Sequence, residues 1–384
     1  MPNLASHIPA VPESGTRRIF ELAMTLDDPI MLVVGEPDVP VAPHIAEAAR
    51  LAWERDDTNY AANGGLAPLR RAIVVKLAAE NGIAVDVEQV WVTVGGTQAL
   101  AQAFTLTLGE GDEVLIPDPG YTTFTMYPRA KGAVPVPYPL RAEHGFTPSM
   151  VELELLVTEH TRAIVVNSPS NPLGVVFGPD VLAEIVRFAA RHDLWIISDE
   201  VYEHFTWDAP HTSLARVAAE QGEQDRVLSV FSTSKSFAMT GARVGWLVTP
   251  PGVAGTMRAL QESMIACVSM PEQYAAIAAL TGPMDHLERA RERYRAAIEE
   301  ATALLDERGL RYHRPQGAFY LWIDVSHATD GDVAAWAQRF LLTQGVAVAP
   351  GSAFGRGGEG WIRICLAADA ADVRTAIQRL PRPE

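Results

Sequence analysis

Polar side chains follow several apolar, β-branched runs of the sequence, at the points where strands would end. Asp199 closes the run LWIISD, and Lys235 comes four residues after the run RVLSVF. Asn171 lies in the turn SPSNPLG, which directly follows RAIVVN. Ligands of parallel sheets bind at the carboxyl ends of the strands. We therefore expect an acid, an amine and an amide to face one crevice.

A glycine turn and one arginine add the features of an anion site. The segment GGTQ, with Gly96 and Thr97, follows the run WVTV and opens a helical stretch, and Arg243 comes eight residues after Lys235. The N–H groups and the dipole of a helix start attract phosphate, and a guanidinium strengthens such a site. Each feature alone has an ordinary alternative, such as helix capping for Asp199, solvent exposure for Lys235 or tight packing for the glycines.

Taken together, these groups suit one ligand, pyridoxal 5′-phosphate, which combines an aldehyde, a protonatable ring nitrogen and a phosphate. A lysine amine bonds covalently to the aldehyde, and an acid keeps the ring nitrogen protonated so that the ring withdraws electrons. Hydroxyls, backbone N–H groups and an arginine hold the phosphate. The combination therefore indicates a pyridoxal-phosphate enzyme.

The order of apolar runs predicts the elements that position these side chains. From about 43 to 282, strand-like runs alternate with amphipathic helical stretches, which is typical of a mainly parallel sheet covered on both faces. The expected strands are 91–94, 113–117, 133–138, 162–167, 194–199, 226–231 and 244–249. A helix is expected near 17–26, before the large sheet. A long charged helix, short strands at 318–324, 346–350 and 361–367 and a final helix follow the sheet. We therefore expect an α/β large domain at 43–282 and a smaller α+β domain made from 1–42 and 283–384.

Composition limits the kinds of partner and location. The chain has 384 residues, of which 48% are hydrophobic, and this suits a globular protein with one large core or two domains. A net charge of −16 argues against binding nucleic acid or an anionic membrane, because both need clustered Lys and Arg. No apolar run approaches the roughly 20 residues that span a bilayer, and no secretory signal opens the sequence. Cys267 and Cys365 are far apart and form no CxxC pair, so we expect free thiols and no metal site. Free thiols suit a reducing compartment, and together with the lack of a signal they predict a cytoplasmic protein.

In order and spacing, these segments resemble the fold-type I pyridoxal-phosphate-dependent aminotransferases of the class I/II superfamily, within the bacterial aspartate, aromatic and alanine type branch. The resemblance extends from about residue 33 to 367, and its most specific segments are SDEVY at 198–202 and STSKSFAMTGARVG at 232–245. Other matching segments are GEPD (35–38), NYAANGGLAPLRRAI (59–73), GGTQAL (95–100), DPGY (118–121), NSPSNPLG (167–174), PQGAFY (315–320), APGSAFG (349–355) and WIRI (361–364). The resemblance implies the PLP-dependent transferase fold type I, with a seven-stranded sheet in the large domain.

The resemblance also implies a catalytic role for each matching residue. Lys235 bonds to the cofactor aldehyde and later moves a proton between the substrate Cα and the cofactor. Asp199 pairs with the ring nitrogen. Tyr202 and Asn171 hydrogen-bond the phenolic oxygen, and Tyr121 stacks on the ring.

The remaining matches concern the phosphate, the substrate and a second subunit. Arg363 is implied to hold the substrate α-carboxylate with two hydrogen bonds, assisted by Asn171 and the backbone of Gly35. Tyr60 is implied to reach the phosphate in the neighbouring subunit, so the active unit would be a homodimer. The phosphate contacts within one chain are implied for Gly96, Thr97, Ser232 and Arg243.

The implied reaction is a ping-pong transfer of an amino group from an L-amino acid to a 2-oxo acid such as 2-oxoglutarate. No Lys or Arg occurs between Arg258 and His286, where some dicarboxylate-specific relatives place a second basic residue. This absence favours neutral, branched or aromatic amino acids, with Phe20, Tyr121, Met264, Ile265 and Phe354 as candidate walls of a side-chain pocket. Arg17, Arg18, Arg129 and Arg356 remain candidates for binding a second carboxylate, with a solvated surface role as the commoner alternative for each.

Two departures from the family pattern and two rival functions remain open. Leu173 replaces a common Thr in the asparagine turn, and Ala242 replaces a common aromatic residue before Arg243. A β-elimination lyase or an aminocyclopropane-carboxylate synthase-like enzyme would use the same lysine and aspartate. A non-catalytic ligand-binding sensor is a more remote alternative, because such regulators carry an added N-terminal DNA-binding domain and fewer than 40 residues precede GEPD here.

Overall fold

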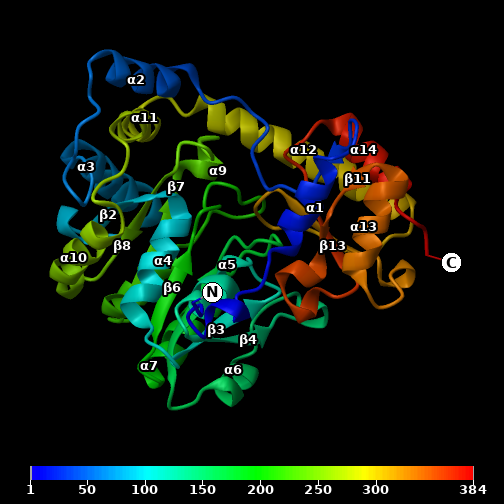
Figure 1. Cartoon of the computed structure of the whole chain (residues 1–384), viewed down its shortest axis with the longest axis horizontal. Coiled ribbons are helices and arrows are strands. Elements are labelled where there is room, and N and C mark those ends of the chain that lie inside the picture. The colour runs from blue at the N-terminus through cyan, green and yellow to red at the C-terminus, as the bar shows by residue number, and fades with distance from the viewer. Residues whose placement is uncertain (1, 384) are drawn as a thin grey trace.

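A seven-stranded sheet forms the centre of the larger lobe in the computed structural model, which describes residues 2–383 (Figure 1). Its order is β2-β8-β7-β6-β5-β3-β4. Strand β8 is antiparallel to both of its neighbours, β2 and β7, and all other neighbouring pairs are parallel. The bounds are β2 Val90–Val94, β3 Glu113–Asp118, β4 Val134–Pro139, β5 Thr161–Asn167, β6 Trp195–Asp199, β7 Val227–Ser232 and β8 Val244–Val248. The predicted α/β fold with a mainly parallel seven-stranded sheet is therefore confirmed.

The central strands are mainly apolar because both faces of the sheet are buried. On β5, Ile164 packs in a core cluster with Ile185 of helix α7 (Pro179–Arg191), while the next residue, Val165, packs in a second cluster with Phe104 of helix α4 (Gly95–Thr107). Successive strand side chains point to opposite faces, so helices on both faces require an unbroken apolar run. This packing explains why the sequence shows continuous rather than alternating hydrophobicity there.

Helices surround the sheet and extend the larger lobe, on the left in Figure 1. Helices α2 and α11 pack against each other, and α11 also packs against α3. A π-helical turn, Leu77–Asn81, continues α3 directly. The other bounds are α2 Pro43–Glu54, α3 Ala67–Lys76, α5 Thr123–Ala130, α6 Met150–Leu156, α8 Leu214–Glu220, α9 Thr233–Ser236, α10 Ala254–Ile265 and α11 Met270–Thr281.

The smaller lobe, on the right in Figure 1, combines both ends of the chain. Strand β1 (Ile30–Met31) pairs in parallel with β11 (Val346–Ala347), and helix α1 (Gly15–Ala23) packs against α13 (Val333–Gln344). A four-stranded antiparallel sheet has the order β12-β13-β10-β9. The remaining bounds are α12 Asp285–Glu307, α14 Ala370–Arg379, β9 Tyr312–His313, β10 Tyr320–Asp324, β12 Ala349–Pro350 and β13 Trp361–Cys365.

Two expectations for this lobe need adjustment. The single strand expected at 346–350 is divided, because its first half pairs with β1 and its second half with β13. The helix expected near 17–26 begins at Gly15, where the Ser14 hydroxyl accepts a hydrogen bond from the Arg17 N–H, and it ends at Ala23. The cap sets this start, since a serine oxygen satisfies a backbone donor that lacks an intrahelical partner.

Candidate active site

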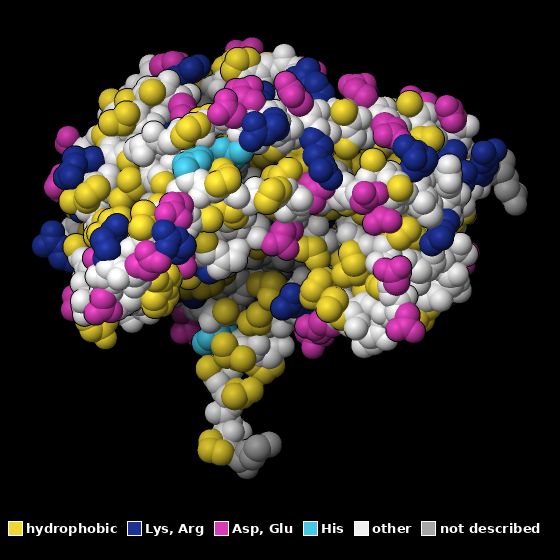
Figure 2. Space-filling model, turned by 90° about the horizontal axis from the view of Figure 1, so that it is seen from above, with side chains coloured by type: hydrophobic (Ala, Val, Ile, Leu, Met, Phe, Trp, Pro, Cys, Tyr) yellow, Lys and Arg dark blue, Asp and Glu magenta, His cyan; other side chains and the backbone are white. Residues whose placement is uncertain are grey.

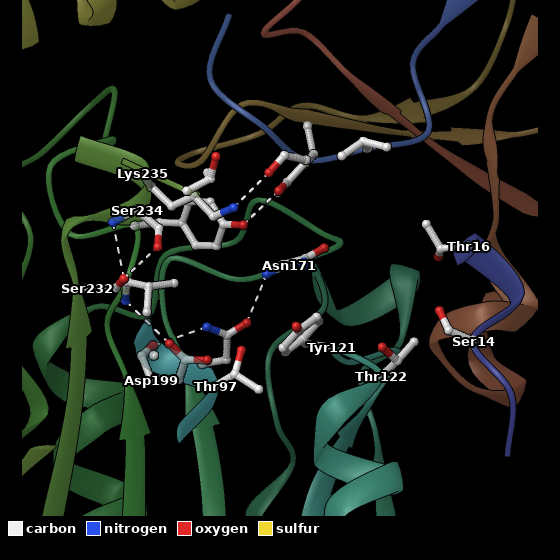
Figure 3. A pocket seen from close by; sticks show the side chains of 18 of the residues that line it. Ser14, Thr16, Thr97, Tyr121, Thr122, Asn171, Asp199, Ser232, Ser234 and Lys235 are labelled. Atoms are coloured by element: carbon white, nitrogen blue, oxygen red, sulfur yellow. Dashed lines mark hydrogen bonds between the residues drawn. The ribbon is translucent and has the colours of Figure 1, made fainter. Parts of the chain in front are cut away.

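A cavity of about 360 Å³ opens at the carboxyl ends of the central strands, between the two lobes (Figure 3). In Figure 3, Lys235 and Asp199 approach it from the sheet side, Tyr121 and Asn171 from loops, and Ser14 from the segment before α1. The predicted site residues that line it are Gly35, Gly96, Thr97, Tyr121, Asn171, Asp199, Tyr202, Ser232, Lys235, Arg243 and Arg363. Within one chain, the structure thus brings together every predicted site residue except Tyr60.

Lys235 lies on the short helix α9, directly after the buried strand β7. The Ser232 hydroxyl accepts the Ser234 N–H at 3.1 Å and caps this turn, which directs the lysine into the cavity. The Lys235 amine donates to the Gly35 carbonyl at 2.7 Å. Burial lowers the pKa of Lys235 to about 8, although the charges around it act in both directions. Part of the amine is therefore uncharged, and so nucleophilic, near neutral pH.

Asp199 ends strand β6 and is only 3% exposed. Its carboxylate accepts one backbone hydrogen bond, from the Val201 N–H at 3.3 Å. Burial raises the pKa of Asp199 to about 7; the Val201 N–H and Lys235 lower it, and Glu200 raises it. A carboxylate with so few partners would be stabilised by a cation inside the cavity, and a protonated ring nitrogen would provide one.

The side of the cavity that carries Lys235 and Asp199 also has the donors that an anion requires (Figure 3). Gly95 begins helix α4 at φ +71°, and a Cβ there would lie 2.5 Å from Nη2 of Arg243. The absence of a side chain thus lets the guanidinium approach the helix start. The hydroxyls of Ser232 and Ser234 lie 2.8 Å apart on the same wall. Hydroxyls, an arginine and a helix N-terminus together fit the phosphate of the cofactor.

Arg363 on β13 supplies a buried positive charge at the far side of the cavity. Nη1 donates to the Asn171 side-chain oxygen at 2.8 Å, and Nη2 donates to the Val33 carbonyl at 2.6 Å. Its Nε is buried without a partner among residues 2–383, and the guanidinium carbon lies 4.4 Å from the ring centroid of Tyr320 and 5.0 Å from that of Phe354. Since these partners are neutral, the guanidinium remains available for a carboxylate.

Tyr202 faces the cavity from the loop after β6. Its hydroxyl lies 2.6 Å from the hydroxyl of Tyr320, and its ring centroid lies 5.8 Å from the Lys235 amine. Burial raises the pKa of Tyr202 well above its ordinary value, so the hydroxyl keeps its proton. Tyr121, whose ring packs edge-on against Phe124, provides an aromatic surface in the same cavity.

Comparison with known families identifies this arrangement. The sequence model of the family described as aminotransferase class I and II matches residues 27–380. The chain belongs to this family. The resemblance inferred from the sequence is thus confirmed, and the protein is an amino acid aminotransferase.

Individual relatives of this aminotransferase match over the whole chain. It is 36% identical to the aspartate/prephenate aminotransferase of Thermus thermophilus, over 100% of this chain and 99% of the relative. It is 35% identical to aromatic-amino-acid aminotransferase 2 of Thermococcus litoralis, over 99% of this chain and 97% of the relative. Among solved structures, a single mutant of the Thermus thermophilus aspartate aminotransferase superposes with a TM-score of 0.92 at 35% identity, covering 99% of both chains.

Sequence reasoning missed several residues of the aminotransferase cavity, among them Ser234, Asn167 and Tyr320. Ser234 carried the same signal as Ser232, a hydroxyl in the STSK segment. Asn167 ends strand β5, and its side chain donates to the Asp199 carbonyl at 3.0 Å. Tyr320 closes the PQGAFY segment, but only the packing of β10 beside β13 brings it to the cavity.

The candidates for substrate side-chain contacts separate into two groups. Arg17, Phe20 and Phe354 line the cavity, whereas Met264 and Ile265 do not. Arg17 is exposed and forms an ion pair with Glu21 at 3.3 Å. The other arginine candidates line an adjoining cavity of about 850 Å³, which shares Thr122 and Phe354 with the first: Arg18, Arg129 and Arg356.

The two departures from the family pattern lie outside the cavity lining. Leu173 is fully buried in the main core cluster, where a threonine would place a hydroxyl among apolar side chains. Ala242 packs against a small cluster that includes Ile45 of α2 and Phe237. Both residues therefore act through packing behind the site.

Across residues 2–383, no group of three or more His, Cys, Asp or Glu side chains is arranged to bind a metal ion. No helix in the same range is both long and apolar enough to cross a membrane.

Proposed function

We propose that the cavity binds pyridoxal 5′-phosphate and that the aminotransferase moves an amino group between an L-amino acid and a 2-oxo acid by a ping-pong mechanism. The proposal rests mainly on three buried groups with neutral hydrogen-bond partners: the Lys235 amine, the Asp199 carboxyl and the Arg363 guanidinium. A ligand with a carbonyl, a protonated nitrogen and a carboxylate-bearing substrate would engage all three.

The side chains would divide the work by position. When bound, the cofactor supplies an aldehyde that links to an amine and a ring that withdraws electrons from the substrate Cα. Lys235, partly uncharged because its pKa is lowered to about 8, would hold the cofactor through its aldehyde and would move the proton at the substrate Cα. Asp199 holds the proton on the ring nitrogen. Arg363 fixes the α-carboxylate, so that Cα stays within reach of the lysine.

The phenolic oxygen and the phosphate of the cofactor would be held at opposite sides of the ring. Tyr202 and Asn171 would donate to the phenolic oxygen, and Tyr121 would cover one ring face. The phosphate would bind the start of α4 and the side chains of Thr97, Ser232, Ser234 and Arg243. The buried rings of Tyr320 and Phe354 would limit the access of water to the reacting atoms.

For the substrate, we propose neutral, branched or aromatic amino acids with 2-oxoglutarate as acceptor. Apolar side chains, among them Phe20, Leu100 and Phe354, line the cavity beside the polar groups. Apart from Lys235, Arg243 and Arg363, its cationic lining residue is Arg17, which is exposed and already paired with Glu21. An exposed pair of this kind contributes little binding energy, so the site favours uncharged side chains in the donor.

A single-turnover experiment tests the reaction class. The protein is loaded with pyridoxal phosphate and mixed with one amino acid at a time, without any 2-oxo acid. We expect loss of the visible absorbance and one equivalent of the matching 2-oxo acid per site. Ammonia together with pyruvate would instead support β-elimination, and an unchanged spectrum with every amino acid would support a non-catalytic sensor.

We also propose that the active unit is a homodimer. Tyr60 is 91% exposed and lies outside the cavity of its own chain, and Trp53 on α2 is also exposed. The N-terminal segment, which carries the exposed Leu4, projects from the body of the molecule in Figure 2. Large exposed apolar side chains of this kind suit contact with a second copy.

Finally, we propose that the chain divides into a large domain at 43–282 and a small domain made from 1–42 and 283–384. The pairing of β1 with β11 supports joining the N-terminal segment to the C-terminal part. In this division, Arg363 and Tyr320 belong to the small domain, whereas Lys235 and Asp199 belong to the large domain. The expected cytoplasmic location stays a prediction.

A further inference from the structure

Tyr320 contacts three groups of the active site at once. It is the first residue of β10, and its side chain is 1% exposed. Its hydroxyl lies 2.6 Å from the hydroxyl of Tyr202, and its ring lies under the guanidinium of Arg363. The hydroxyl also touches Gly35, where a Cβ would lie only 2.0 Å away. Gly35 is in turn the residue whose carbonyl accepts the Lys235 amine.

The hydrogen bond between the two tyrosines leaves one proton available. Burial raises the pKa of both phenols, so each hydroxyl carries one proton. In the described chain, neither hydroxyl has another hydrogen-bond partner. One tyrosine therefore donates to the other, and the accepting tyrosine keeps its own proton for a third group.

The position of Arg363 favours Tyr320 as the donor. The guanidinium carbon lies 4.4 Å from the centroid of the Tyr320 ring, within the range of a cation–π contact. A positive charge over the ring withdraws electron density from the phenol and makes its O–H a stronger donor. When Tyr320 donates, the proton of Tyr202 is free, and Tyr202 becomes a stronger donor in its turn.

We propose, resting on the function proposed above, that Tyr320 is a positioning residue: its hydroxyl donates to Tyr202, which leaves the Tyr202 proton for the phenolic oxygen of pyridoxal phosphate, and its ring holds Arg363 in place for the substrate carboxylate. The two parts of this role use different portions of one side chain. Removal of the hydroxyl and removal of the ring therefore have separable effects.

The first variant, Tyr320→Phe, removes only the hydroxyl. In the holoenzyme, the visible absorbance of the lysine-linked cofactor is titrated against pH. A weaker hydrogen bond to the phenolic oxygen makes the linkage more basic, so its pKa is expected to rise by about 0.5 unit. KM for the amino acid should change less than about twofold, because the ring beneath Arg363 remains.

Two further variants separate the hydroxyl from the ring. Tyr320→Leu removes both, so it should show the same rise in pKa together with an increase of about tenfold in KM. In a Tyr202→Phe background, Tyr320→Phe should cause no additional shift, because its effect passes through Tyr202. Tyr138→Phe is the matched control: Tyr138 is equally buried, but its hydroxyl donates to the Val165 carbonyl outside the cavity, and the pKa of the absorbance should stay at the wild-type value.

Specific results would overturn the inference. An unchanged or lowered pKa in Tyr320→Phe, or the same rise in the Tyr202→Phe background, would remove Tyr320 from this role. An unchanged KM in Tyr320→Leu would remove the contribution to Arg363. The wild-type titration distinguishes failure of the Tyr320 inference from failure of the proposed function. A wild-type protein that shows no visible band with pyridoxal phosphate would refute cofactor binding itself.

Discussion

The chain contains three lysines, and each has different surroundings. Lys76 is buried in an ion pair with Glu203, and Lys131 reaches the Thr105 hydroxyl away from the cavity. Lys235 alone lines the cavity, with an amine whose pKa is lowered to about 8. Covalent linkage to an aldehyde needs an accessible, partly uncharged amine. Lys235 is therefore the lysine placed to form the linkage.

This contrast gives a labelling prediction. Borohydride fixes a lysine–aldehyde linkage irreversibly, so reduction of the cofactor-loaded protein should label Lys235 alone, as read by peptide mass spectrometry. Lys235→Ala should lose the label, the visible absorbance and at least about 10³-fold of the turnover. Lys131→Ala is the control and should keep all three. A label on Lys76 or Lys131 would contradict the assignment.

Asp199 illustrates how a site residue can cost stability. Burial raises the pKa of Asp199 from 3.8 to about 7, so the folded protein binds a proton there that the unfolded chain has already lost. By linkage, this contribution to stability is complete below about pH 3.8 and disappears as the pH rises through 7. Above pH 7 the ligand-free protein thus contains an unfavourable buried charge.

Asp199→Asn removes that charge without changing the shape of the side chain. We expect the ligand-free variant to be more stable than the wild type, with a gain about 2 kcal/mol larger at pH 8 than at pH 5.5. Turnover should nevertheless fall by at least about 100-fold, because an amide cannot stabilise a protonated ring nitrogen. Urea unfolding at the two pH values, together with an activity assay, measures both effects. Equal gains at both pH values would contradict the raised pKa.

At the scale of elements, a buried polar cluster fixes the helix that carries Lys235. Lys76 at the end of α3 lies 2.5 Å from Glu203, and Asn81 in the following turn bridges the two side chains. His204 directly follows Glu203 in the sequence, and its Nδ1 lies 2.7 Å from the hydroxyl of Ser236 on α9. The cluster therefore connects α3 and the loop after β6 to the segment beside Lys235.

This cluster should make a large contribution to stability, which a double-mutant cycle can measure. Lys76→Met leaves Glu203 buried and unpaired, so the free energy of unfolding at pH 7 should fall by about 3–5 kcal/mol. Lys76→Met with Glu203→Leu should recover most of this loss. Burial would raise the pKa of Glu203, but Lys76, His204 and Asn81 hold it at about 2, so the contribution fades as the pH falls from 4.5 towards 2. An unchanged free energy of unfolding in Lys76→Met would contradict this account.

The sequence predicts the strands of the large sheet but not the pairings between segments that are distant in the sequence. All seven strands of the large sheet were predictable from their sequence runs, and central runs such as RAIVVN are apolar because both faces of the sheet are buried there. The division of 346–350 into β11 and β12 was not, since it depends on pairing with β1 and β13, which are distant in the sequence. Tyr320 was missed for the same reason: the register that places it beside Cys365 is a tertiary feature.

At the scale of the whole molecule, the predicted role of Tyr60 depends on a second copy. Residues that act within one chain, such as Lys235, could be placed by motif and strand end. Tyr60 is 91% exposed on its own chain and does not line the active-site cavity of that chain. If it contacts the phosphate of the neighbouring subunit, each active site combines Lys235 of one chain with Tyr60 of the other.

Subunit mixing tests this arrangement directly. Tyr60→Phe alone should weaken cofactor binding by about tenfold, since one hydrogen bond to a charged group is lost. In a heterodimer of one Lys235→Ala chain and one Tyr60→Phe chain, one site contains both changes and the other contains neither. The mixed dimer should therefore bind cofactor with wild-type affinity at half of its sites. If Tyr60 instead acted within its own chain, every site of the mixed dimer would be defective, and the affinity would stay at the Tyr60→Phe value.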